Sequence, residues 1–177
     1  LKPIDTGVDA VIGTSAMYLE GTRKEIARML DMARVNVDRS FHAFIHADSG
    51  AIKDVEEREA YIDYLNKEIS RAISKMMIHE TNEKNSKNIG SYFEMTGNIE
   101  RIGDHAVNIC DYTNLLQENQ IKFSNDAIRE MQEMREICSH MFERLKRAPE
   151  NPKEWLEKIH DSENIVDKKT DEFYEKH

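Results

Sequence analysis

Three pairs of acidic residues in this chain share the spacing E-x-x-x-D. They are Glu59 and Asp63, Glu100 and Asp104, and Glu163 and Asp167. In an α-helix a spacing of four stacks both carboxylates on one face, about 6 Å apart. Two such pairs on adjacent antiparallel helices would bring four carboxylates within reach of one cation cluster. Such an oxygen-rich shell suits Mg²⁺, Mn²⁺, Fe or Zn²⁺, so these residues are candidate metal ligands.

The alternative is that the pairs are ordinary solvated helix faces. The chain carries 34 Asp and Glu residues, so pairs at this spacing also arise by chance. Helical phase places Glu100 and Asp104 nearly opposite the apolar stripe of their segment, and Glu59 and Asp63 lie at the edge of theirs. We therefore expect the acids to point outward, and any metal that they hold to lie at the surface.

Histidine and cysteine offer weaker candidates. His42 and His46 form an H-x-x-x-H pair, which can chelate a transition metal, but the acid of the zinc-protease pattern is missing between them. Histidines at the boundary of the core are the favoured interpretation. His105 follows Asp104 and could orient a metal ligand, although a role in helix packing is the favoured interpretation. Cys110 is expected to be a buried, inert thiol.

Composition excludes several functional classes. The 177 residues carry a formal net charge of -9, and no Lys/Arg cluster breaks this balance, so no nucleic-acid partner is expected. The sequence contains no nucleophile–base constellation, phosphate-binding glycine loop or dinucleotide fingerprint, which argues against an enzyme. Two cysteines are too few for a disulfide framework, and no apolar run is long enough to cross a membrane.

Amphipathic helices must position these residues, because apolar residues recur at spacings of three and four residues and the alternation typical of strands is absent. We expect an all-α fold of long antiparallel helices. A helical stretch over 8–19 is expected before the first long helix, with Gly21 as an interruption or a bend. The long helices are expected over about residues 22–47, 52–79, 89–116, 124–145 and 152–177.

Turn and cap residues separate these helices. Residues 48–50 are expected to form a turn, and the polar stretch 81–88 a linker. Ser124 and Asn151 are expected N-caps, the latter followed by Pro152 in the first helical turn. Three glycines of the third helix predict close packing or a bend there: Gly90, Gly97 and Gly103.

An internal repeat organises the helices. Residues 59–63 match residues 163–167 at an offset of 104, which suggests a duplicated three-helix unit. We expect residues 1–120 to form the first unit with an N-terminal helical extension, and residues 121–177 the first two helices of a second, truncated unit. Because the chain begins without Met and ends within an expected helix, we expect it to be part of a longer protein.

The run from Asn98 to Ile109, with the pattern ERIGDHA-x-NI, resembles the signature of the PhoU family. Residues 27–29 and 59–65 resemble features of the family's first two helices. The resemblance implies antiparallel helical bundles, here one complete three-helix unit and part of a second. It also implies surface metal clusters of Fe, Zn, Mn or Mg at the E-x-x-x-D pairs, although the second cluster would be incomplete without a sixth helix. The implied ligands are Glu59, Asp63, Glu100, Asp104, Glu163 and Asp167.

The resemblance further implies a non-enzymatic domain that regulates phosphate uptake on the cytoplasmic side of the membrane. Residues 21–30 favour a domain fused to a sodium-dependent phosphate cotransporter, with the membrane transporter, a signalling protein or a second copy as partner. The alternative is a free-standing regulator of a phosphate ABC transporter and its sensor kinase. A carboxylate-bridged metalloenzyme is less favoured, because its Glu-x-x-His motif is not found in phase.

Overall fold

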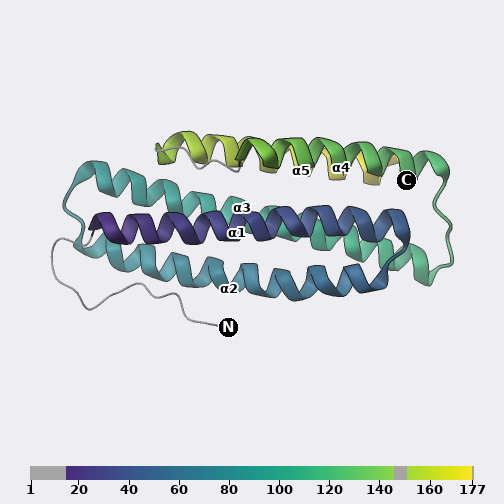
Figure 1. Cartoon of the computed structure of the whole chain (residues 1–177), viewed down its shortest axis with the longest axis horizontal. Coiled ribbons are helices and arrows are strands. Elements are labelled where there is room, and N and C mark those ends of the chain that lie inside the picture. Colours follow the sequence, from purple (N-terminus) through teal and green to yellow (C-terminus); the bar gives the residue numbers. More distant parts are fainter. Residues whose placement is uncertain (1–14, 146–150, 177) are drawn as a thin grey trace.

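The helical periodicity of the sequence corresponds to five long helices in a computed structural model, which describes residues 15–145 and 151–176 (Figure 1). They are α1 (Ser15–His46), α2 (Ser49–His79), α3 (Glu83–Glu118), α4 (Asn125–Leu145) and α5 (Pro152–Lys176). The predicted all-α fold of antiparallel helices is confirmed. None of the helices in the described part of the chain is long and apolar enough to cross a lipid bilayer.

Helices α1, α2 and α3 start earlier than predicted. Residues 15–19 of the helical stretch predicted over 8–19 belong to α1, which Gly21 does not interrupt, and residues 8–14 lie outside the described residues. The predicted turn at residues 48–50 is found at residues 47–48 instead, because Asp48 Oδ1 accepts hydrogen bonds from the backbone N–H groups of residues 50 and 51 and α2 begins at Ser49. Asn82 caps α3 in the same way, so residues 83–88 are helical rather than a linker.

The two predicted N-caps of the later helices are confirmed. The backbone N–H of Ala127 donates to Ser124 Oγ at 3.0 Å, and that of Lys153 donates to Asn151 Oδ1 at 3.1 Å. Each bond satisfies a donor that the first helical turn would otherwise leave unpaired. Short polar side chains therefore fix where α4 and α5 begin.

The helices pack in layers. Helices α1, α2 and α3 contact one another in a three-helix bundle, and α4 and α5 cover its α1–α3 side, with α4 on α1 and α5 on α3 (Figure 1). Within the described residues, α2 contacts only α1 and α3. Helix α3 therefore lies between α2 and α5.

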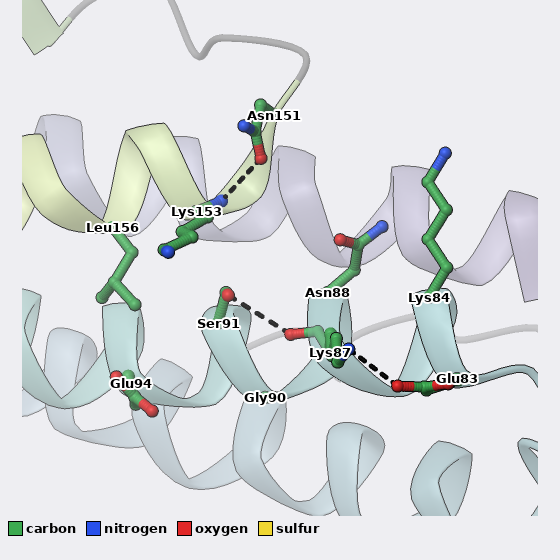
Figure 2. A pocket seen from close by; sticks show the side chains of 10 residues that line it. All are labelled: Glu83, Lys84, Lys87, Asn88, Gly90, Ser91, Glu94, Asn151, Lys153 and Leu156. Carbon is green, nitrogen blue, oxygen red and sulfur yellow. Dashed lines mark hydrogen bonds and ion pairs between the residues drawn. The ribbon is translucent and has the colours of Figure 1, made fainter.

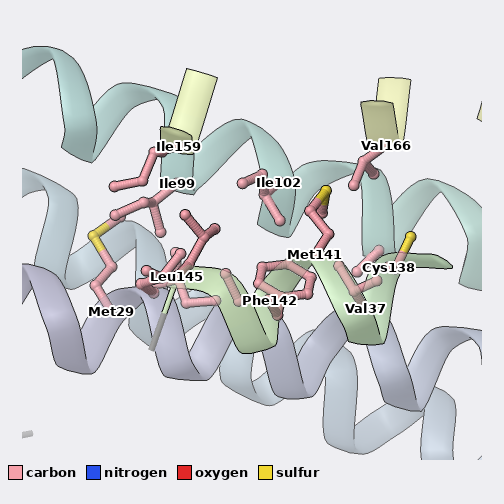
Figure 3. Close-up of a cluster of buried hydrophobic side chains, with 14 of the residues drawn as sticks. Met29, Val37, Ile99, Ile102, Cys138, Met141, Phe142, Leu145, Ile159 and Val166 are labelled. Carbon is pink, nitrogen blue, oxygen red and sulfur yellow. The ribbon is translucent and has the colours of Figure 1, made fainter. Parts of the chain in front are cut away.

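A single apolar core joins all five helices. Figure 3 shows the part of this core where side chains of α4 and α5 meet those of α1 and α3. Ile137 recurs in helical phase with Met134 and Met141, but it is 44% exposed, whereas Cys138 and Phe142 are buried in this core. The division of the chain at residue 120 stays a prediction.

Both cysteines lie in this core as free thiols. Cys110 on α3 and Cys138 on α4 are buried, and burial raises the pKa of each thiol to about 12. Because the thiolate is the reactive form, thiols in these surroundings are inert. The expectation of a buried thiol at Cys110 is confirmed.

Candidate functional site

The acidic pairs of α2 and α3 meet at Gly103. A Cβ added to Gly103 would overlap the Glu59 carboxylate, whose Cδ lies 3.0 Å from that position. Gly103 therefore lets Glu59 lie directly against the α3 backbone, as the predicted close packing requires. At Gly90 and Gly97 the prediction of close packing is wrong, because an added Cβ would meet nothing within 4 Å.

A buried asparagine of α1 orients this carboxylate. Asn36 is fully buried, and its Nδ2 donates to the backbone oxygen of Val55 at 3.2 Å and to Glu59 Oε2 at 3.4 Å. Its Oδ1 accepts from Arg58 Nη1 at 3.0 Å. Asn36 was not predicted as part of the site. Its position three residues after Ala33, among the apolar residues of α1, indicated a buried amide that would need hydrogen-bond partners.

The electrostatics of Glu59 show that the two pairs act on one another. Burial raises the pKa of Glu59 to about 7, and the negative charges of Asp104, Glu100 and Asp63 add to this rise, while the Asn36 hydrogen bond opposes it. Burial also raises the pKa of Glu100, followed by the charges of Asp104 and Asp63. The structure therefore brings the four predicted residues of α2 and α3 into one negatively charged site, which we call the α2–α3 acidic site.

These acids are less uniformly exposed than their helical phase predicts. Asp104 is exposed as expected, but Glu59 is half-buried between α2 and α3 because Gly103 leaves room for it. Asp63 Oδ2 accepts a hydrogen bond from Lys67 Nζ at 2.6 Å. Among residues 15–145 and 151–176, no group of three or more His, Cys, Asp or Glu is arranged to hold a metal ion.

The acidic pair of α5 has different surroundings. Glu163 is fully buried, so the expectation of outward-pointing acids is wrong for this residue. Arg101 Nη2 of α3 lies 2.7 Å from Glu163 Oε1 as an ion pair, without the alignment of a hydrogen bond. His105 Nε2 lies 3.7 Å from Glu163 Oε1 and 3.5 Å from Asp167 Oδ1. We call these four residues the α3–α5 ion-pair site.

The remaining histidine candidates agree with a boundary position. The rings of His42 and His46 lie 4.4 Å apart between centroids, with His42 half-buried and His46 exposed. His42 Nε2 is 3.5 Å from Asp48 Oδ2, the carboxylate that caps α2. This arrangement matches histidines at the edge of the core.

An open groove of about 680 Å³ lies between the first turns of α3 and α5 (Figure 2). Its charges are mixed and partly satisfied, because Lys87 Nζ donates to Glu83 Oε1 at 2.7 Å. Leu156 is its one apolar side chain, so the groove has neither the apolar walls nor the convergent polar groups of a small-molecule site. It is lined by Glu83, Lys84, Lys87, Asn88, Gly90, Ser91, Glu94, Asn151, Lys153 and Leu156.

The five helices form an all-α antiparallel bundle, and α2 and α3 bring four of the predicted acidic residues together. Comparison with known families identifies a PhoU domain over residues 26–113, which span most of α1, all of α2 and most of α3. No curated protein and no solved structure matched the chain. The PhoU domain implies a role in regulating phosphate uptake, and because this family consists of non-enzymatic regulators, the prediction that the chain is not an enzyme is confirmed.

Proposed function

We propose that this chain is the cytoplasmic regulatory domain of a sodium-dependent phosphate cotransporter. The observation that supports this proposal is the run Asn98–Ile109 of α3, which places Glu100 and Asp104 beside Glu59 at Gly103. The run 21–30 favours the fused setting over a free-standing regulator. The helical bundle would act by contacting the membrane part of the transporter or a signalling protein, and it performs no chemical step.

The fused setting is tested by the coding sequence upstream of residue 1. Hydrophobic spans encoded there would support a cotransporter. An upstream region without such spans would contradict the fused setting and favour the regulator of a phosphate ABC transporter and its sensor kinase.

Regulation itself is tested by phosphate uptake in cells that express the full-length protein at equal levels. Wild type should adjust uptake to external phosphate, whereas Glu100→Ala with Asp104→Ala should not. An unchanged response in the double variant would contradict a role of the α2–α3 acidic site.

A divalent or iron-type cation at the α2–α3 acidic site is the second part of the proposal. Within the described residues the acids are not arranged as a closed metal site, and the observation that supports a cation is their shared charge: burial, and then the charges of Asp104, Glu100 and Asp63, raise the pKa of Glu59. When bound, Fe, Zn, Mn or Mg would supply the positive charge that this site lacks. Glu59 and Asp63 would hold the cation from α2, and Glu100 and Asp104 from α3.

Elemental analysis of protein purified without chelator tests the cation. Glu100→Ala with Asp104→Ala should lower the metal content, because it removes both α3 donors. Glu94→Ala, an exposed acidic residue on the same helix, is the matched control and should leave the content unchanged. Equal metal content in all three proteins would exclude this site.

A further inference from the structure

The acidic pair of α5 has the spacing of a metal site, but it faces an arginine and a histidine. Arg101 and His105 of α3 lie against Glu163 and Asp167, whereas Glu59 on α2 lies among other acids. We propose that Glu163 and Asp167 are not a cation site and that they instead fix α5 to α3 through an ion pair with Arg101. This inference limits the metal part of the proposed function to the α2–α3 acidic site.

Burial of Glu163 makes its charge depend on a partner. The side chain is 1% exposed, so its carboxylate has lost nearly all of its water. Within the described part of the chain, neither oxygen receives a hydrogen bond. A buried charge without a partner is strongly destabilising, and Arg101 Nη2 at 2.7 Å is the closest cationic atom to Glu163.

Arg101 is suited to compensate this charge. Its side chain is 56% exposed, so the guanidinium reaches Glu163 while much of it keeps its water. Only one member of the pair therefore bears the full cost of desolvation. The arginine is a positioning residue, since it acts by holding α5 and its core side chains against α3.

The same cationic group opposes a metal ion. A divalent cation at Glu163 and Asp167 would lie beside a permanently charged guanidinium, because arginine does not lose its proton in proteins. The ion would have to displace Arg101 from the only buried carboxylate of the pair. At Glu59 the corresponding neighbours are Asp104 and Glu100, which a cation would stabilise.

Consecutive residues of α3 produce this difference. Glu100 and Asp104 lie on the side of α3 that faces α2, and Arg101 and His105 follow each of them by one position. One residue turns the side chain by about 100° around a helix, which directs the second pair to α5. The run ERIGDH therefore serves two interfaces with opposite charge.

A thermodynamic cycle on the full chain tests the ion pair. Arg101→Ala should lower the urea midpoint and shift Trp155 fluorescence to longer wavelength, because Glu163 is left buried without a cation. Trp155 is the only tryptophan and is buried on α5, so it reports on this helix. Arg101→Ala combined with Glu163→Gln should recover most of the midpoint and the wild-type spectrum, because the buried charge is gone.

Lys158→Ala is the matched control, because it removes an exposed ion pair with Glu154 on the same helix and should change neither signal. An Arg101→Ala protein with wild-type stability would overturn the inference. So would a double variant that is no more stable than Arg101→Ala alone.

Equilibrium dialysis against Mn²⁺, followed by elemental analysis, tests the absence of a cation at α5. Glu163→Gln with Asp167→Asn should bind as many ions as wild type, whereas Glu100→Gln with Asp104→Asn should lose them. Loss of ions in the α5 variant would overturn the inference and leave the α2–α3 acidic site standing. A wild-type protein without bound Mn²⁺ would count against the metal part of the proposed function, and the thermodynamic cycle would then decide the inference.

Discussion

The two sides of α3 make opposite use of the same acidic spacing. On one side, α2 presents Glu59 to Asp104 and Glu100, and burial, followed by the repulsion from these acids, raises the pKa of Glu59 to about 7. On the other side, α5 presents Glu163 to Arg101, and the charges compensate one another. The first interface has an excess of negative charge that a ligand could neutralise, whereas at the second the chain itself supplies a cation for the buried Glu163.

This difference shows that an acidic pair acquires its role from the helix that it faces. The pairs of α2 and α5 agree in residue type and spacing, and both lie against the same turns of α3. Their chemistry nevertheless differs because α3 presents carboxylates to α2 and the guanidinium of Arg101 to α5. Changes in α3 should therefore affect the two sides differently.

Charge reversal at Arg101 should have the largest effect. Arg101→Glu places a carboxylate against the buried Glu163, so we expect a loss of about 3–5 kcal/mol in the free energy of unfolding. Urea denaturation followed by circular dichroism measures this loss. Arg71→Glu, which reverses the charge of an exposed ion pair on α2, should cost less than about 1 kcal/mol. Equal effects of the two reversals would show that the α3–α5 ion-pair site contributes nothing special.

A methyl group at Gly103 should displace the Glu59 carboxylate. Gly103→Ala forces this carboxylate, the end of a flexible side chain, out of its position, which offsets the gain of about 0.5–1 kcal/mol in helix propensity. Gly97→Ala is the matched control on the same helix, where an added Cβ meets nothing, so helix propensity should stabilise it by about 0.5–1 kcal/mol. Chemical denaturation of both variants gives the comparison, and an equal gain in stability for the two variants would refute the contact between Gly103 and Glu59.

The pH dependence of stability should identify Glu59. Its pKa of about 7 lies above the ordinary value of 4.5, so between these values the folded protein binds more protons than the unfolded chain. In metal-free protein the contribution of Glu59 to stability therefore falls as pH rises from about 4.5 to 7, and Glu59→Gln should remove this part of the dependence. The effect should be on the order of 1 kcal/mol, because water screens a half-buried group.

Thermal unfolding at pH 5 and pH 8 in the presence of chelator measures this dependence. Glu57→Gln changes an exposed acid of α2 and serves as the control. If Glu59→Gln and wild type lose the same stability between the two pH values, the pKa of Glu59 is not raised in the folded protein.

Removal of Lys67 should have the smallest effect on stability. Its ion pair with Asp63 is exposed, with side-chain exposures of 64% and 46%, so Lys67→Ala should cost at most about 1 kcal/mol. The variant should bind Mn²⁺ about two- to fivefold more tightly, since a nearby positive charge is gone. Isothermal titration calorimetry with Lys53→Ala, an exposed lysine of the same helix, as control gives this ratio. Weaker binding by Lys67→Ala would place the cation elsewhere.

Much of the fold and part of the site follow from the sequence. Apolar periodicity predicts the helices because each buries one face, and it predicts the α2–α3 acidic site through the spacing of four. Periodicity does not predict that α3 and α5 would be neighbours, and without this knowledge Arg101 and Glu163 cannot be paired. The starts of α2 and α3 were missed for a local reason, since Asp48 and Asn82 cap helices in segments whose polar composition indicated a turn and a linker.

The buried thiols of the core have a practical consequence for measuring these interfaces. With a pKa of about 12, Cys110 and Cys138 carry on the order of one thiolate per hundred thousand molecules at pH 7. Maleimide reagents would therefore leave both thiols of the native protein unmodified and react with any cysteine introduced at the surface. Cysteines introduced on α2 and α5 could therefore carry spectroscopic labels in the wild-type chain. The distance between the two helices can then be followed without first replacing Cys110 or Cys138.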